Sequence, residues 1–360
     1  MRRDSLSPVI SNLRFPLALM VVYIHSFGFG ECDLSDLNIL HLSSYDIYNI
    51  VRTLISKVIC QIAVPLFFFF SGYLFFKKLE TWNWETYKTK ISKRFFTLLI
   101  PYIIWNTIRF FSNSYFSDTS LSDFSLTSFW HDGYVDAGGY TNWFGTVISI
   151  SHPIHVAFWF IRDLIVMVLL SPAIYYILRK AGTLFVIFLL FCFLSSIWPT
   201  FPGQSIRSVF FFTFGAFICI RKIDLISYLE KKRVFIYGIT LTTCFVVTFL
   251  GGGVKEVYEY LFPIFVLTGC GTIILLSSNY KPEKQICSFL GRCSFLLYAI
   301  HPILLQIKGQ CFNSHIYTNN VIILVTIYLI TPIIITITCI PACYIIEKHT
   351  KILRILLIGK

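Results

Sequence analysis

The sequence predicts an all-α integral membrane protein of about ten transmembrane helices, with both termini in the cytoplasm. Three observations lead to this prediction: a low content of charged residues, a series of long apolar segments, and a charge that alternates between successive connections. Of the 360 residues, 56% are hydrophobic and 13% are charged, whereas soluble domains contain about 25% charged residues. We therefore expect one transmembrane domain over residues 1–360 and no sizeable soluble domain.

The apolar segments set the expected number of helices, because a membrane-spanning helix needs about 20 largely apolar residues. Ten segments approach this length, at 8–29, 50–76, 95–111, 156–178, 184–198, 205–220, 234–250, 257–276, 293–307 and 321–346. The first is too long for the hydrophobic part of a signal peptide, so we expect it to remain as the first helix. The 11 cysteines lie mostly within apolar segments, show no metal-ligand spacing, and are expected to be small buried hydrophobic residues.

The charges of the connections fix the predicted orientation. Most of the 30 Lys and Arg residues fall in the even-numbered connections and in the two ends of the chain. The first and third connections instead carry acidic residues. Cytoplasmic loops are enriched in Lys and Arg, so the basic side, with both termini, is predicted to be cytoplasmic. The same rule accounts for the net charge of +12, and we expect no nucleic-acid partner.

The third connection, at about 112–155, is the only long one and is expected to be an external loop. Its aromatic residues are Trp130, Tyr134, Tyr140 and Trp143. Long loops in compact proteins are usually functional or disordered. These rings suit either stacking on a sugar or resting at the membrane interface, and we favour the interface.

Ionisable residues within the predicted spans are costly in a bilayer and usually face a bundle interior or a water-filled cavity. The predicted orientation places most of them in the outer half of the membrane: His25, Arg52, Arg162, Asp163 and His301. They indicate a polar cavity that opens outward. The alternative is that arginines near helix ends reach the headgroups along their aliphatic stems, which suits Arg52, Arg109 and Arg207 better than Arg162.

The first predicted helix carries Arg14 and, eleven residues later, His25. Eleven residues return to nearly the same helix face with a rise of about 16 Å, although Pro16 can bend the first turn. Arg14 is expected on the cytoplasmic side, where it can hold a phosphate of coenzyme A. A neutral imidazole at His25 can then act as general base or take up an acyl group as nucleophile. For the pair taken alone, a structural polar contact is the alternative.

Five blocks of sequence, in this order, share a pattern with a known family: Arg14 and His25; 64–78 with Ser71-Gly72; Lys93-Arg94 with Pro101, Tyr102 and Trp105; Trp159 with Arg162-Asp163; and Tyr298 with His301-Pro302. Together they resemble acyltransferase family 3, whose members are integral membrane enzymes that modify extracytoplasmic glycans. The resemblance covers most of the chain.

The resemblance implies acetyl-CoA or another acyl-CoA as the donor, with no permanently bound cofactor. The acceptor would be a hydroxyl of an extracytoplasmic glycan or lipid-linked saccharide at a bacterial inner membrane. His25 is the implied catalytic residue, and Arg14, Lys93 and Arg94 are the implied donor-binding residues. The sequence does not indicate an oligomeric state.

On the acceptor side, the resemblance and the predicted depths point to Arg162, Asp163, His301, Trp159 and Arg52. Ser71 and Gly72 are expected to permit close helix packing rather than to take part in chemistry.

Two other functions compete with this hypothesis. A transporter or flippase also places charged residues in the membrane, but it commonly shows internal repeats, and none is clear here. A glycan polymerase is expected to carry arginines in its external loops, and the third connection has none between Arg109 and Arg162.

Overall fold

The structure of the protein is a computed structural model. It describes residues 6–26, 43–77, 82–116, 120–141, 147–199, 201–249, 255–280, 284–312, 320–349 and 351–359. These fall into two compact units. The first unit comprises Met1–Val64 and Leu225–Cys343, and the second comprises Pro65–Asp224 and Tyr344–Lys360. We describe each unit by itself, and the single domain expected from the sequence remains a prediction.

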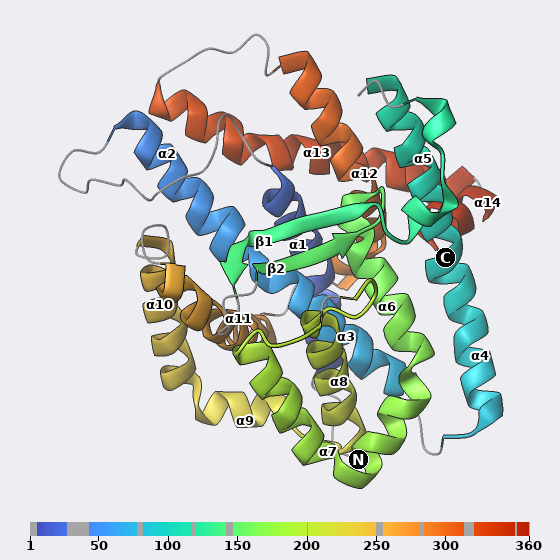
Figure 1. The fold of residues 1–360 in the computed structure, drawn as a ribbon, viewed down its shortest axis with the longest axis vertical. Helices are drawn as coiled ribbons and strands as arrows, with labels where there is room; N and C mark the ends of the chain where they lie inside the picture. The colour runs from blue at the N-terminus through green and yellow to red at the C-terminus, as the bar shows by residue number, and fades with distance from the viewer. Residues whose placement is uncertain are drawn as a thin grey trace. The chain divides into compact units, whose positions relative to one another are not determined.

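The first unit is helical in its described part. Its elements are α1 (Leu6–His25), α2 (Ser44–Arg52), the π-helical turn η1 (Thr53–Val58), the 3-10 turn η2 (Ile59–Ile62), α9 (Leu225–Lys231), α10 (Arg233–Phe249), α11 (Lys255–Ser278), α12 (Lys284–Phe312) and most of α13 (Val321–His349). Helices α10 and α11 lie side by side (Figure 1), and the hydroxyls of Thr240 and Thr272 meet between them at 3.0 Å. In an apolar helix pair, such a hydrogen bond satisfies two polar groups at once.

The second unit adds a small sheet to its helices. Its elements are most of α3 (Ala63–Phe76), α4 (Trp84–Arg94), η3 (Phe95–Leu99), α5 (Ile100–Phe116), η4 (Leu121–Asp123), η5 (Leu126–Phe129), β1 (Gly133–Thr141), β2 (Val147–His152), η6 (Val156–Phe158), α6 (Trp159–Leu169), α7 (Ser171–Leu194), α8 (Ile206–Ile220), α14 (Lys351–Leu353) and η7 (Arg354–Ile358). Helices α4 and α5 follow one another as one long run through η3 (Figure 1).

Described helices overlap all ten predicted apolar segments, and an all-α membrane protein fits the structure. The fourth segment, however, is divided among η6, α6 and the start of α7, and α7 continues into the fifth segment. Seven described helices are long and apolar enough to cross a membrane: Leu6–His25, Tyr45–Phe76, Trp84–Phe116, Ser171–Leu194, Tyr260–Ser278, Ile286–Gln310 and Val321–Lys348. An eighth span results if α9 and α10, bent by 77°, count as one. Within α7, Ala181 has non-helical dihedral angles directly after the basic pair Arg179 and Lys180, where we predicted a connection. The count of ten and the cytoplasmic termini remain predictions.

The segment predicted as a long loop at 112–155 differs from the expectation. Helix α5 continues to Phe116, because the aromatic residues after Arg109 extend its apolar run. Further along, β1 and β2 pair as an antiparallel hairpin, drawn as the two green arrows in Figure 1. Much of this connection is therefore ordered by backbone hydrogen bonds. Tyr134, Tyr140 and Trp143 lie among the residues whose side chains the structure leaves undescribed.

A close crossing of α3 and α8 explains Gly72, which we predicted to serve packing. A Cβ atom on Gly72 would lie 2.0 Å from the carbonyl oxygen of Phe212, and one on Gly215 would lie 2.0 Å from that of Phe69. Each glycine thus lies against the backbone of the other helix. On each helix, the glycine and the carbonyl that meets the other glycine are three residues apart. Small residues allow this approach between membrane helices, and the packing role of Gly72 is confirmed.

Candidate functional site

Helix α1 carries both Arg14 and His25. It runs unbroken from Leu6 to His25 and includes Pro16, so the proline does not separate the two residues. Eleven helical residues amount to three turns plus about 20°, and a rise of about 16 Å. The two side chains therefore share a helix face, with His25 at the carboxyl end of the helix.

Helix α12 lies beside α1 and runs in the same direction. Two contacts show this. The Cδ atom of Arg14 lies 3.9 Å from where a Cβ of Gly291 would be. Further along both helices, the rings of His25 and His301 lie 5.2 Å apart, at 37° to each other. The contacts are separated by eleven residues on α1 and by ten on α12. The structure thus brings His301 to His25, while their catalytic roles stay predictions.

The backbone of its own helix orients His301. This residue is fully buried, and its Nδ1 lies 3.3 Å from the carbonyl oxygen of Leu297, one helical turn earlier. A carbonyl oxygen only accepts hydrogen bonds, so we assign the proton to Nδ1. In the neutral ring, Nε2 then carries the lone pair. The Tyr298 ring lies next to it, with centroids 6.1 Å apart.

The last turn of α1 is closed around His25 by hydrogen bonds from serines. The amide of Ser26 donates to the carbonyl of Tyr23 at 3.2 Å, and the Ser26 hydroxyl donates to the carbonyl of Val22 at 2.7 Å. The Ser56 hydroxyl also donates to the Tyr23 carbonyl. The last carbonyls of a helix lack partners within it, and these bonds supply them.

His25 and Arg14 make no hydrogen bond or ion pair of their own in the described part of the chain. His25 is half-buried and Arg14 is exposed. Neither ring nitrogen of His25 is bonded to another described group, so the lone pair of a neutral ring remains available to accept a proton.

Arg52 belongs to the same unit and is almost fully buried, at 1% exposure. Its Nη2 donates to Oδ1 of Asn49 at 3.1 Å, and its guanidinium lies 5.0 Å from the centre of the Tyr48 ring. Both partners precede it on α2. Its predicted place on the acceptor side remains a prediction.

In the second unit, Arg162 lies in a hydrogen-bond network on α6. Its Nη1 donates to the carbonyl of Trp130 at 2.8 Å and to the Ser151 hydroxyl at 3.1 Å. Its Nη2 donates to the Ser151 carbonyl at 2.9 Å and to Oδ1 of Asp163 at 3.0 Å. Its Nε is 3.4 Å from the same Asp163 oxygen. A guanidinium has five N–H groups, and all five are directed at protein acceptors.

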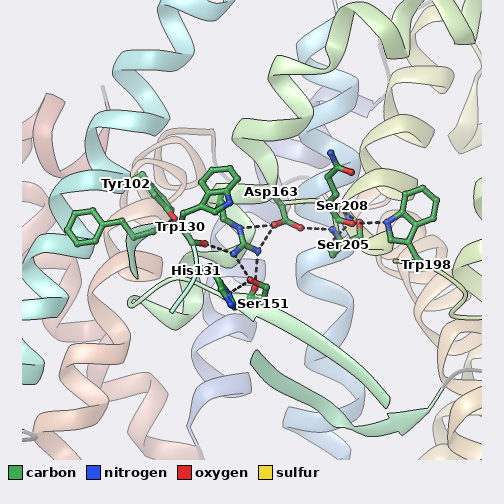
Figure 2. A network of polar contacts seen from close by, with 11 residues as sticks. Tyr102, Trp130, His131, Ser151, Asp163, Trp198, Ser205 and Ser208 are labelled. Atoms are coloured by element: carbon green, nitrogen blue, oxygen red, sulfur yellow. Dashed lines mark hydrogen bonds and ion pairs between the residues drawn. The ribbon is translucent and has the colours of Figure 1, made fainter. Parts of the chain in front are cut away.

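Asp163 extends this network to another helix. Its Oδ2 accepts a hydrogen bond from the amide of Ser205 at 3.0 Å, and the Ser205 hydroxyl in turn caps α8 by accepting from the amide of Ser208. Figure 2 shows Trp130, Ser151, Asp163 and Ser205 gathered in this network. Arg162 and Asp163 are 1% and 0% exposed. The pair thus fastens the segment around Trp130, strand β2 and the start of α8 to α6.

The other predicted site residues of the second unit are Trp159, on the same helix as Arg162, and Lys93 and Arg94, on α4. Trp159 begins α6, and its ring packs against that of Phe68, with centroids 6.1 Å apart. Lys93 and Arg94 end α4. Lys93 is exposed, Arg94 is partly buried, and Lys93 makes no hydrogen bond or ion pair within the described residues.

Sequence reasoning did not find the partners of these groups. Two of the four acceptor atoms for Arg162 are backbone carbonyls, which no residue type signals. A third is the hydroxyl of Ser151, which lies in the segment predicted as a loop. Ser26 and Ser56 are recognisable in the sequence as hydroxyls within apolar segments. The sequence does not show, however, that these hydroxyls bond to carbonyls of α1. Among the described residues, no group of three His, Cys, Asp or Glu side chains is placed to hold a metal ion.

Comparisons with known proteins found one family. A model of an acyltransferase domain, named Acyl_transf_3, matches residues 9–344. No curated protein and no solved structure matches the chain. The matched region includes every residue discussed above as a candidate for the site.

Proposed function

The chain belongs to acyltransferase family 3, and from that premise we propose that it moves an acetyl group from cytoplasmic acetyl-CoA to a hydroxyl of an extracytoplasmic glycan or lipid-linked saccharide. His25 is the reactive residue of this proposal. The family and the apolar helices make the chain a multi-pass membrane acyltransferase. The acetyl group, the saccharide acceptor and a bacterial inner membrane are our proposals.

The observation that carries the proposal is that His25 has unused ring nitrogens and lies beside a second imidazole. It ends α1, makes no hydrogen bond with another described group, and lies against a second imidazole, that of His301, at 5.2 Å. Two charged imidazoles at this distance would repel each other, so the pair takes up at most one proton beyond those of the two neutral rings. An imidazole that takes up and returns one proton during each turnover is what general-base catalysis needs.

The reaction can follow two routes from this geometry. In the first, His25 takes the proton of the acceptor hydroxyl while its oxygen attacks the thioester carbonyl. The carbon–sulfur bond breaks, and the coenzyme A thiolate receives the proton from His25. In the second, a nitrogen of His25 attacks the thioester, and the carbon–sulfur bond breaks to release the thiolate. The acceptor hydroxyl then displaces the acyl group from the ring, and its proton passes to the thiolate. Both routes leave His25 as it began.

Arg14 supports the donor side of the proposal. It is exposed, has no hydrogen bond or ion pair within the described residues, and lies about 16 Å along α1 from His25. A phosphate held by Arg14 would leave the long pantetheine arm of the donor to reach His25. Lys93 and Arg94 are proposed to add further positive charge for the phosphates, and Lys93 is exposed.

On the acceptor side we propose Arg52, Trp159 and His301. Arg162 and Asp163 were predicted there too, but their hydrogen bonds go to protein groups. We propose that this pair serves the acceptor indirectly, through the segment around Trp130 and Ser151 that it holds.

The test compares the surface glycans and lipid-linked saccharides of source cells that lack the gene with those of cells carrying it intact or as His25→Ala. We expect an acetyl mass increment of 42 Da on one saccharide only with the intact gene. Immunoblots of the membranes check that the variant inserts. An increment that persists with His25→Ala would contradict the proposal. A flippase would instead alter the amount of saccharide outside, without this mass difference.

A further inference from the structure

We propose that Ser56 and Tyr328 form a positioning pair that fixes the last turn of α1, and with it the ring of His25. This inference rests on the proposed function, because it assigns the pair a role in catalysis by His25. Neither residue belongs to the sequence blocks that indicated the family.

Ser56 accepts one hydrogen bond and donates another. Ser56 is 1% exposed, its hydroxyl donates to the carbonyl of Tyr23, and its oxygen lies 2.6 Å from the hydroxyl of Tyr328. A serine hydroxyl has a single proton. Because that proton goes to the Tyr23 carbonyl, Tyr328 must be the donor in the other bond. The chain of bonds thus leads from Tyr328 through Ser56 to the backbone of α1, two residues before His25.

A second contact ties the same turn to α13. The hydroxyl of Tyr23 donates to the carbonyl of Leu329 at 2.9 Å, next to Tyr328 in the chain. The rings of Tyr23 and Tyr328 meet edge to face, with centroids 6.1 Å apart. Tyr328 is 2% exposed and packs in a cluster with Tyr48 and Leu324. Both the carbonyl and the side chain of Tyr23 are therefore held from outside α1.

The local backbone around Ser56 departs from α-helical geometry. Ser56 lies in the π-helical turn η1, which a 3-10 turn follows. Between them, Val58 has φ −115° and ψ −77°. π-Helical turns inside longer helices occur frequently at functional sites. Here the irregular turn contains Ser56, which bonds to both α1 and α13.

The function of this chain of bonds follows from the needs of the reaction. His25 must lie within hydrogen-bond reach of the acceptor hydroxyl while the thioester is bound. A displacement of about 1 Å can lower a rate by about 100-fold. Without Ser56, the Tyr23 carbonyl keeps only the 3.2 Å bond from the Ser26 amide among those described. The backbone of the last turn is then held less tightly, although the Tyr23 hydroxyl still bonds to Leu329. Arg14, three turns away, is not affected.

The experiment measures transfer from [14C]acetyl-CoA to the lipid and glycan extract of source cells, catalysed by the purified full-length protein. The variants are Ser56→Ala, Tyr328→Phe and the double variant, with Ser56→Thr as the conservative replacement. Two controls remove buried hydroxyls of the first unit that are not part of this chain of bonds. They are Ser277→Ala on α11 and Thr336→Val, whose hydroxyl bonds only to Pro332 of its own helix.

We expect kcat to fall about 10- to 100-fold for Ser56→Ala and for Tyr328→Phe, with the donor KM within about twofold of the wild-type value. The double variant should be no slower than Ser56→Ala, because the two residues act through one bond to the Tyr23 carbonyl. Ser56→Thr keeps a hydroxyl donor and should recover most of the rate, and both controls should stay within about twofold.

Three results would overturn the inference: wild-type kcat in Ser56→Ala, independent losses that multiply in the double variant, or a parallel loss in the controls. Thermal unfolding separates a misfolded variant from an inactive one. If Ser56→Ala does not fold, failure of Ser56→Thr to restore the rate overturns the inference instead. Wild-type protein and His25→Ala are measured alongside. No transfer by the wild type, or full transfer by His25→Ala, contradicts the proposed function itself rather than the pair.

Discussion

The carboxyl end of α1 and the first half of α6 both carry ionisable side chains in apolar helices, but the two regions use these side chains differently. His25 is half-buried and makes no hydrogen bond with another described group. Arg162 is 1% exposed, and each of its N–H groups is directed at a protein acceptor. A group that must exchange a proton or bind a substrate needs unused hydrogen-bonding capacity. A group whose capacity is used up holds structure together. By this criterion His25 is a candidate reaction centre, and Arg162 is a candidate fastening point.

The largest expected effect on stability tests the fastening role of Arg162. Arg162→Ala leaves the carboxylate of Asp163 buried without its guanidinium partner, and breaking such a buried pair costs about 3–5 kcal/mol. Thermal unfolding of the purified protein in detergent checks this. Arg162→Lys keeps the charge but not the planar set of five donors. Its unfolding temperature should therefore lie between those of Arg162→Ala and the wild type.

The matched comparison is His25→Ala, which removes no described hydrogen bond. It should change the unfolding temperature much less than Arg162→Ala does. Equal stability of Arg162→Ala and the wild type would show that Arg162 is not a fastening point, and would return it to the candidates for acceptor binding.

A smaller effect is expected at Arg14, which like His25 is an ionisable residue of α1 with no hydrogen bond or ion pair among the described residues. Arg14→Ala should raise the KM for acetyl-CoA about tenfold and leave kcat nearly unchanged, because it removes one charged contact to a phosphate, worth about 1.4 kcal/mol. Steady-state rates at varied donor concentration measure this. An unchanged donor KM would mean that Arg14 does not hold the donor.

The smallest effect is expected at the edge of the Arg162 network. Ser205→Ala removes the side chain that caps α8, while the Ser205 amide still donates to Asp163. Loss of such a cap costs about 1 kcal/mol. Unfolding temperature is again the readout, and the donor KM should not change. If Ser205→Ala lowered the unfolding temperature as much as Arg162→Ala does, the cap rather than the ion pair would be the main source of stability in this region.

The sequence predicted the helices well because the bilayer imposes a simple rule on them. Each predicted apolar segment overlaps a described helix, and Ser205, where the sixth segment was predicted to start, caps α8. The hairpin of β1 and β2 was not predicted, because Gly and polar residues around Tyr140 are typical of a loop. The end of α5 was placed too early, at 111 rather than Phe116, since Asn and Ser in its last turns looked like a loop.

For the candidate site, the spacing of Arg14 and His25 predicted their shared helix face, and the family resemblance pointed to His301. The sequence could not show that His25 makes no hydrogen bond while Arg162 is saturated. The partners of Arg162 include the carbonyls of Trp130 and Ser151, and every residue has a carbonyl. Only the fold selects which of them meet a guanidinium.

Transfer catalysed by purified protein tests the central claim most directly, namely that His25 is the reactive group. Wild-type protein and His25→Ala are mixed with [14C]acetyl-CoA and the extract of source cells, and label in the saccharide is followed at matched amounts of folded protein. We predict loss of at least about 100-fold in rate for His25→Ala, as expected for removal of a general base or nucleophile, with an unfolding temperature close to that of the wild type. Transfer at the wild-type rate by a folded His25→Ala protein would contradict the account.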